Sequence, residues 1–203
     1  MRLRAALGAV AISVLLLSAC GGEEAEPAGI VRDPAPDLAA LSLPDAANGN
    51  AEFAFKADPG RLLVVYFGYT SCPDVCPTTL ADVRSALEDM GDDAQYVDLA
   101  MITVDPDRDD AERLTAYVQS FVPESHALRT DDPDHLLAVA EPFGAFYEVE
   151  TAEDGTVEVG HTAFLYGIDD AGLLQLQWAF GTEPEDLRSD FTLLINRAKE
   201  NRG

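Results

Sequence analysis

Two cysteines four positions apart are the residues of this chain best suited to chemistry. Cys72 and Cys76 lie in the segment 69–77 (YTSCPDVCP), immediately after an apolar run. Two thiols at this spacing can hold a soft metal ion or form a disulfide, and a disulfide could be a reversible redox centre or a structural staple. The chain has 3 cysteines, and the third, Cys20, lies in a different context. The pair alone leaves all three uses open.

The elements on either side of the pair predict how it is placed. Residues 62–67 (LLVVYF) form the continuous apolar run typical of a buried strand, and residues 78–90 have apolar positions at helical spacing. Because the first turn of a helix does not need the amide that proline lacks, we expect this helix to begin at about Pro77. Cys76 would then lie at the helix N-terminus, where the partial positive charge favours a thiolate.

The rest of the chain alternates first and then changes character. Strand and helix alternate over 97–104, 111–121, 127–130 and 133–141, which favours an α/β fold with parallel pairing. Three strand-like segments follow at 146–151, 156–166 and 173–180; turns separate them, and we expect the strands to be antiparallel. A last helix is expected at 184–198. This order predicts an α/β, thioredoxin-like fold: a central mixed sheet flanked by helices, with an inserted segment and a C-terminal β-hairpin.

The first twenty residues indicate export. Basic residues precede an apolar stretch, residues 5–17, that is too short to span a membrane. Residues 17–21 (LSACG) resemble a bacterial lipobox, so we expect a lipoprotein signal peptide at 1–19 and a lipid on Cys20. The alternative is an ordinary cleaved signal followed by an unmodified cysteine. The lipobox predicts an extracytoplasmic protein, lipid-anchored to the outer face of a bacterial cell membrane, in an oxidising space.

Composition indicates one acidic domain after this leader. A chain of 203 residues with 47% hydrophobic content can bury one substantial core. Residues 20–44, rich in Gly, Ala, Pro and acidic residues, predict a flexible tether, which leaves 45–203 as the domain. The net charge of -24 argues against binding nucleic acid or anionic headgroups. It suits a solvated surface or steering towards a cationic or metal-bearing partner.

Three motifs together resemble the SCO/SenC family of copper chaperones. They are, in the family's order, residues 68–80 (GYTSCPDVCPTTL), 104–109 (VDPDRD) and 160–166 (GHTAFLY). The resemblance runs from about Pro36 to the C-terminus and implies a thioredoxin-like fold with a copper site made by Cys72, Cys76 and His161. It also implies a role in delivering copper to the copper A centre of cytochrome c oxidase, or in reducing the thiols of that centre. The implied partners are the copper A-bearing subunit and possible further copper chaperones or a thiol reductase.

Donor chemistry points in part to the same residues. Cu(I) prefers thiolates and accepts imidazole at low coordination number, whereas a closed zinc site would need a fourth ligand that this sequence does not offer nearby. His161 lies at the start of a strand, where its ring can face a neighbouring loop. Asp105 ends a strand, where open α/β sheets build their sites. It either tunes the copper site or docks the partner, or it caps the turn before Pro106.

Other candidate ligands have simpler interpretations. We expect His126 and His135 at the surface among acidic residues, Met101 in the core, and Asp74 in solvent. The leading hypothesis is therefore reversible copper capture by the thiol pair with a distal histidine. The alternative is an enzyme, a thiol-disulfide reductase that uses the same pair, and a third possibility is an interaction module stapled by a stable disulfide.

Overall fold

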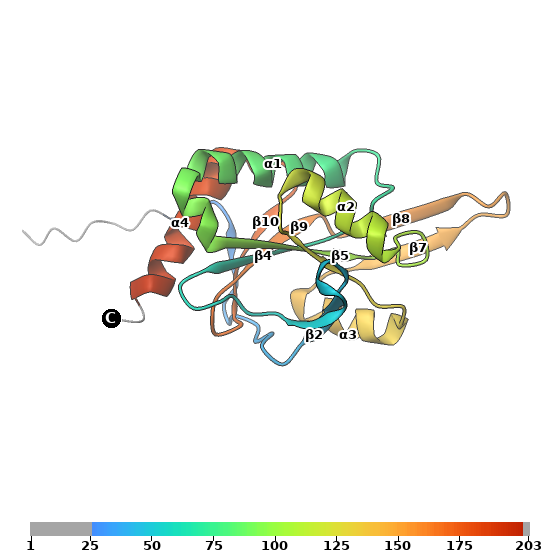
Figure 1. Ribbon diagram of the computed structural model, residues 1–203, viewed down its shortest axis with the longest axis horizontal. Helices are drawn as coiled ribbons and strands as arrows, with labels where there is room; N and C mark the ends of the chain where they lie inside the picture. The colour runs from blue at the N-terminus through green and yellow to red at the C-terminus, as the bar shows by residue number, and fades with distance from the viewer. Residues whose placement is uncertain (1–25, 201–203) are drawn as a thin grey trace, which may run out of the picture.

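An eight-stranded mixed sheet forms the centre of the molecule in the computed structural model, which describes residues 26–200 (Figure 1). The strand order is β1-β10-β9-β4-β5-β6-β2-β3. The strands are β1 (Ile30–Val31), β2 (Ser42–Asp45), β3 (Ala51–Ala54), β4 (Leu62–Gly68), β5 (Val97–Thr103), β6 (His126–Leu128), β9 (Phe164–Ile168) and β10 (Leu174–Ala179). Two short 3-10 helices, η1 (Ala46–Asn48) and η2 (Gly91–Tyr96), connect neighbouring elements.

Strand β4 lies in the middle of this sheet because its sequence can be buried on both faces. All seven of its residues are buried. It pairs in parallel with β5 and antiparallel with β9, and β5 pairs in parallel with β6. The predicted parallel alternation and the antiparallel C-terminal strands are therefore confirmed, and they meet at β4.

Within residues 26–200, four α-helices cover the sheet. They are α1 (Val75–Met90), α2 (Ala111–Phe121), α3 (Pro133–Phe143) and α4 (Pro184–Glu200). Helix α1 packs against α4 and α2, and Figure 1 places α3 on the other side of the sheet. Asp132 caps α3 by accepting hydrogen bonds from the backbone N–H groups of Asp134 and His135.

Aromatic side chains tie these helices to the sheet. Phe143 of α3 packs edge-on against Phe67 of β4 and Tyr166 of β9, with ring centroids 5.2 and 5.1 Å apart. Trp178 of β10 packs in the same way on Phe191 of α4, at 5.2 Å. These rings are fully buried, so the core lies on both faces of the central strands.

A separate hairpin, β7 (Tyr147–Thr151) and β8 (Val157–His161), projects from the body of the domain (Figure 1). The sequence predicted one strand over residues 156–166, and this is wrong: the segment forms β8 and then β9, which belong to different sheets. The break occurs at Thr162, whose N–H donates to the Phe146 carbonyl (2.8 Å) and whose Oγ1 accepts from the Phe146 N–H (2.9 Å). These bonds close the base of the hairpin, so β8 ends beside the main sheet.

The segment before β2 is packed on the domain. Strand β1 pairs antiparallel with β10, and Leu38 is fully buried. The expectation of a flexible tether that continues to residue 44 is therefore wrong from β1 onwards. The predicted signal peptide and Cys20 lie outside the described residues.

A buried carboxylate holds the start of this packed segment. Asp190 of α4 is 3% exposed, and its Oδ2 accepts hydrogen bonds from the Gly29 N–H and the Trp178 Nε1–H, both at 2.8 Å. The Ala28 N–H donates to Oδ1 of the same carboxylate. A Cβ atom at position 29 would lie 2.5 Å from Trp178 Nε1, so the close approach requires glycine.

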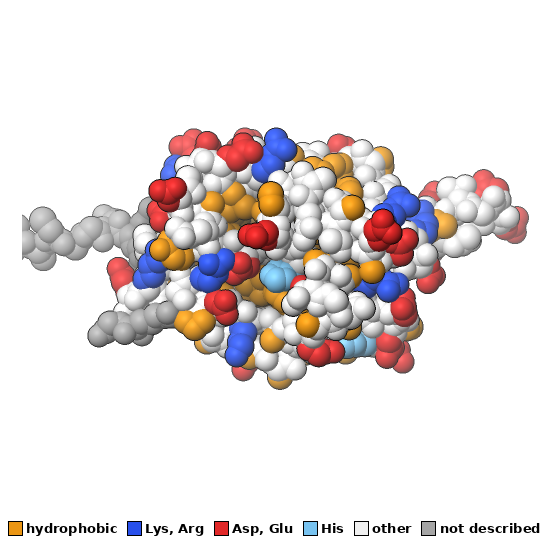
Figure 2. Space-filling model, viewed as in Figure 1, with side chains coloured by type: hydrophobic (Ala, Val, Ile, Leu, Met, Phe, Trp, Pro, Cys, Tyr) orange, Lys and Arg blue, Asp and Glu red, His pale blue; other side chains and the backbone are white. Residues whose placement is uncertain are grey.

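The surface carries many carboxylates but no membrane-spanning element in the part described. Over residues 26–200, no helix combines the length and the hydropathy needed to cross a bilayer. On the face drawn in Figure 2, acidic side chains are interspersed with basic ones, and the projecting hairpin is acidic at its tip. Glu148, Glu150 and Glu158 of this hairpin are exposed.

Candidate metal centre

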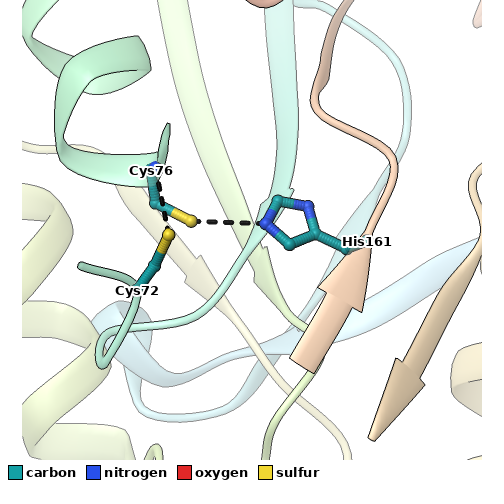
Figure 3. Close-up of side chains that lie close together, drawn as sticks. All are labelled: Cys72, Cys76 and His161. Atoms are coloured by element: carbon teal, nitrogen blue, oxygen red, sulfur yellow. Dashed lines mark hydrogen bonds between the residues drawn. The ribbon is translucent and has the colours of Figure 1, made fainter. Parts of the chain in front are cut away.

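The two cysteines lie where the central strand passes into the first helix. Strand β4 ends at Gly68, residues 69–74 form a loop, and α1 begins at Val75. Cys76 therefore lies in the first turn of α1, slightly further inside the helix than predicted, and is fully buried. Cys72 lies in the loop, is partly exposed, and accepts a hydrogen bond from the Cys76 N–H at 3.3 Å (Figure 3). Both thiols are free.

His161 completes the cluster from the other side. It is the last residue of β8, and its ring points at the cysteines (Figure 3). The ring Nε2 lies 3.4 Å from Cys76 Sγ, and Nδ1 lies 3.2 Å from the Thr162 carbonyl oxygen. Because a carbonyl can only accept, Nδ1 carries the hydrogen, and Nε2 of the neutral ring presents a lone pair to the sulfur.

The three donor atoms are close enough to share one ion. The two sulfurs and the imidazole nitrogen all lie within 4.8 Å of one another. Two thiols and an imidazole form a soft donor set that suits Cu(I), with no carboxylate in the cluster. The structure thus brings together Cys72, Cys76 and His161, as the sequence predicted.

Two tyrosine rings fix the orientation of the imidazole. Tyr66 and Tyr69 meet the His161 ring edge-on, with centroids 6.0 and 5.8 Å away. An open hollow of about 330 Å³, lined by Tyr69, Cys72 and His161 among others, lies over the exposed side of the cluster. The cluster is therefore packed against aromatic rings on the inside and accessible from solvent through Cys72.

The thiols differ in acidity, in a way that the sequence did not predict. We expected the helix N-terminus to favour a thiolate at Cys76, and this is wrong: burial raises the pKa of the Cys76 thiol to about 12, and the adjacent Cys72 sulfur adds to the rise. Burial also opposes ionisation of Cys72, but hydrogen bonds from Cys76 lower the Cys72 pKa below its ordinary value. Cys72 is the more acidic thiol, and Cys76 keeps its proton at neutral pH.

Burial also keeps the histidine neutral. The pKa of His161 is lowered because its ring is buried, although the hydrogen bond to the Thr162 backbone opposes this shift. The neutral ring therefore persists further into the acid range than that of an ordinary histidine, and its Nε2 lone pair remains available to a metal ion.

Asp105 lies outside the donor cluster. It is 2% exposed, pairs with Arg108, and its carbonyl accepts from the Asp109 N–H at 3.0 Å, while its own N–H donates to Thr103 Oγ1. These bonds are compatible with the alternative that Asp105 caps the turn before Pro106, which stays a prediction. Its guanidinium partner lies 5.9 Å from the Tyr69 ring centroid, so an indirect effect on the metal centre stays a prediction.

The remaining histidines are not ligands in this arrangement. His126 Nδ1 lies 2.7 Å from Asp45 Oδ2, and His135 Nε2 lies 3.0 Å from the Ser42 carbonyl oxygen. Neither belongs to the donor cluster, in agreement with the expectation that they are not ligands, although both rings are partly buried rather than fully at the surface. Met101 is fully buried in β5 and Asp74 is exposed, as predicted.

Sequence reasoning missed the side chains that hold the cysteine loop from behind. Asp109 is fully buried and accepts hydrogen bonds from Thr70 and Thr103, and Arg113 donates to Thr70 and Ser71. The only signal was the last acid of the 104–109 motif. Hydrogen-bond partners that are about 40 positions apart cannot be found from local spacing.

Gly68 is predicted to be required for the position of Cys76. A Cβ atom at this position would lie 2.7 Å from Tyr66 Cε1 and 3.2 Å from Cys76 Sγ. We expect Gly68→Ala to lower the free energy of unfolding by about 1–3 kcal/mol, because a buried neighbour must move, and to weaken metal binding. Urea unfolding and a Cu(I) titration measure the two effects. Gly160→Ala, beside the histidine but with nothing within 4 Å of its Cβ, is the control, and an equal effect there would contradict the prediction.

The fold and its three convergent donors define a thioredoxin-like protein with a soft-metal or thiol-redox centre at the end of a central strand. The SCO1/SenC family model matches residues 48–196, and the chain belongs to this family. Solved structures agree in fold: ScoI of Bradyrhizobium japonicum with copper bound is 30% identical, with a TM-score of 0.66, over 76% of this chain and 96% of that one. Apo Sco1 of Thermus thermophilus is 26% identical, with a TM-score of 0.67, over 88% and 99%.

Curated relatives match over a shorter region. A SCO2-like protein of Rickettsia prowazekii is 35% identical over 115 residues, which is 56% of each chain. The human mitochondrial SCO1 homolog is 33% identical over 116 residues, which is 56% of this chain and 38% of that protein. The chain thus matches about half or less of the length of these two relatives.

Proposed function

We propose that this protein is a copper chaperone that binds copper through Cys72, Cys76 and His161 and delivers it to the copper A centre of cytochrome c oxidase. The observation that carries the proposal is the convergence of two sulfurs and one imidazole nitrogen within 4.8 Å. The Bradyrhizobium ScoI that resembles this chain was solved with copper bound, and a relative 28% identical from Stutzerimonas stutzeri is named a copper-binding protein. The copper A-bearing subunit as acceptor follows from the family resemblance.

The arrangement of the donors implies an order of capture. Cys72 is partly exposed and the more acidic thiol, so it meets an incoming Cu(I) ion first. Cys76 must then lose its proton, while the neutral His161 already presents Nε2. Release to an acceptor thiolate follows the reverse order, by exchange of one ligand at a time.

The proposal is tested by Cu(I) titration of the full chain carrying Cys20→Ser, which leaves Cys72 and Cys76 as its only thiols. We expect one tightly bound ion per chain, and loss of this binding when both remaining cysteines become serine. X-ray absorption of the loaded protein should report two sulfur ligands and one nitrogen ligand. Tight binding that survives the double replacement would refute the proposal.

A thiol-disulfide reductase is the second candidate, and the unequal thiols favour it. Cys72 would attack a partner disulfide and release one partner thiol, and Cys76 would then attack the Cys72 sulfur and release the second. Two electrons pass to the partner, and the Cys72–Cys76 disulfide remains. A partly exposed, acidic attacking thiol and a buried, protonated resolving thiol are the arrangement that this reaction needs.

The unequal thiols predict unequal alkylation. At pH 7, iodoacetamide should react with Cys72 at least about tenfold faster than with Cys76, because far more of the Cys72 sulfur is thiolate and exposed. Both thiols are followed in one protein, the full chain carrying Cys20→Ser, because the acidity of Cys72 depends on Cys76. Mass spectrometry gives the rate at each cysteine, and urea should remove the difference. Equal rates at the two cysteines of the folded protein would contradict the assignment of the two roles.

We also propose that Cys20 carries the lipid that anchors the protein to the outer face of a bacterial membrane. The lipobox-like residues 17–21 support this location. Metabolic labelling with a fatty acid in a bacterial host should label the chain, and Cys20→Ser should abolish the label. Labelling that persists in this variant would contradict the proposal.

A further inference from the structure

One buried carboxylate ties the cysteine loop to the end of the neighbouring strand. Asp109, just before α2, is fully buried. Its Oδ2 accepts hydrogen bonds from the Thr70 N–H (2.9 Å) and from Thr103 Oγ1 (2.7 Å), and its Oδ1 accepts from Thr70 Oγ1. Thr70 belongs to the loop before Cys72, and Thr103 is the last residue of β5. The pairing of β4 with β5 ends at Gly68 and Thr103. Asp109 therefore extends the connection from the end of β5 to the cysteine loop that follows β4.

A side chain of α2, that of Arg113, supports the same loop. Arg113 Nε donates to Thr70 Oγ1 at 2.7 Å, and its Nη2 donates to Ser71 Oγ at 3.1 Å. Because the Thr70 hydroxyl accepts from Arg113, its single hydrogen is directed at Asp109. Both residues that precede Cys72 are thus held by side chains of, or next to, one helix.

The three donor residues differ in the number of other contacts that hold them in place. Cys76 is set by the first turn of α1, and His161 by the base of the hairpin and by two tyrosine rings. Cys72 lies on a loop, and its hydrogen bonds come from neighbouring residues: its N–H donates to the Tyr69 carbonyl at 3.3 Å, and its sulfur accepts from the Cys76 N–H at 3.3 Å. Its position therefore depends on the residues before it, and hydrogen bonds to a buried carboxylate are the strongest available there.

We propose that Asp109 is a positioning residue for metal capture: through Thr70 it holds the Cys72 sulfur where Cys76 and His161 can share an ion with it. This inference rests on the proposed copper-binding function. A site whose donors are already placed binds its ion without first ordering a loop, so residues behind the ligands contribute to affinity without touching the metal.

The test compares three variants of the full chain carrying Cys20→Ser. Asp109→Asn keeps the shape but turns an N–H₂ group towards N–H and O–H donors, and Thr70→Val removes the hydroxyl from the loop. Thr103→Val is the control, because it removes a hydrogen bond to the same carboxylate, together with the bond from the Asp105 N–H, without touching the loop. Cu(I) affinity is measured by competition with a chelator, and amide exchange of Thr70 is measured in the metal-free protein.

We expect Asp109→Asn to weaken Cu(I) binding about 10–100-fold, with one ion per chain retained, and Thr70→Val to weaken it in the same direction. Thr103→Val should stay within about threefold of the parent protein. The Thr70 amide should exchange faster in Asp109→Asn and at the parent rate in Thr103→Val. The double variant Asp109→Asn with Thr70→Val should bind Cu(I) only slightly more weakly than the single variant with the lower affinity. The reason is that both replacements disrupt the same connection, between Asp109 and Thr70.

Two results of the affinity measurements would overturn the inference. One is a folded Asp109→Asn protein that binds Cu(I) as tightly as the parent; if this variant does not fold, parent-like affinity of Thr70→Val overturns it instead. The other is an equal loss in Thr103→Val, which would mean that the carboxylate serves only the stability of the fold. Unchanged amide exchange of Thr70 in Asp109→Asn would separately show that Asp109 does not hold the cysteine loop. A parent protein that binds no Cu(I) would refute the proposed function instead.

Discussion

Replacement of His161 by alanine is expected to lower Cu(I) affinity by more than about 100-fold, while Cys72 is alkylated at nearly its normal rate. Removing a partner behind a metal ligand already costs about 10–100-fold, and this change removes a donor itself. The alkylation rate should change little because the acidity of Cys72 arises from Cys76 and the loop backbone, and not from the imidazole. The variant therefore separates metal retention from thiol attack.

His126→Ala is the matched control for this experiment. His126 is also partly buried and hydrogen-bonded, to Asp45, but it lies outside the donor cluster. A chelator competition assay measures the affinity, and iodoacetamide labelling measures the attack rate. If His161→Ala and His126→Ala bind Cu(I) equally well, the distal histidine is not a ligand, and the thiol pair alone accounts for binding.

Cu(I) affinity should rise about 10–100-fold for each pH unit near pH 7. Loading removes the proton of Cys76, whose pKa is about 12 in the metal-free protein, and removes up to one more from Cys72. His161 contributes none in this range, because its lowered pKa leaves the ring neutral. Between one and two protons are thus released per ion, so higher pH favours binding.

Calorimetry in two buffers of different ionisation enthalpy counts these protons directly. The count at pH 7 should lie between one and two, and it should match the slope of log affinity against pH. An affinity that does not change between pH 6.5 and 8 would mean that both sulfurs are already ionised without metal. The buried position of Cys76 would then not set its protonation state.

The sequence predicted the parts of the fold that depend on local pattern. The buried run of β4, the helix after it and the β5 strand follow from hydrophobic periodicity, and the parallel order follows from their alternation. The division of residues 156–166 between two sheets did not follow, because strand-like composition continues across Thr162. Only the distant partner Phe146 reveals the break.

For the candidate site too, some features could be predicted from the sequence and others could not. Residue type and motif named Cys72, Cys76 and His161, and the structure brings them together. Their protonation could not be predicted, because the fully buried position of Cys76 depends on packing from β4 and the hairpin, and desolvation there outweighs the helix terminus. The contacts of Asp109 were hidden for the related reason that its partners come from two other segments.

The hydrogen bonds from Ala28 and Gly29 to Asp190 would limit how far from a membrane an anchored domain can exchange copper. With a lipid on Cys20, as proposed, eight residues lead from the membrane to Ala28, the first residue held by Asp190. Eight residues span at most about 26–29 Å. Helix α4, which carries Asp190, lies at the end of the molecule away from β7 and β8 (Figure 1). A domain anchored in this way would stay close to its own bilayer, and its copper-exchange partners would be confined to a thin layer beside that bilayer.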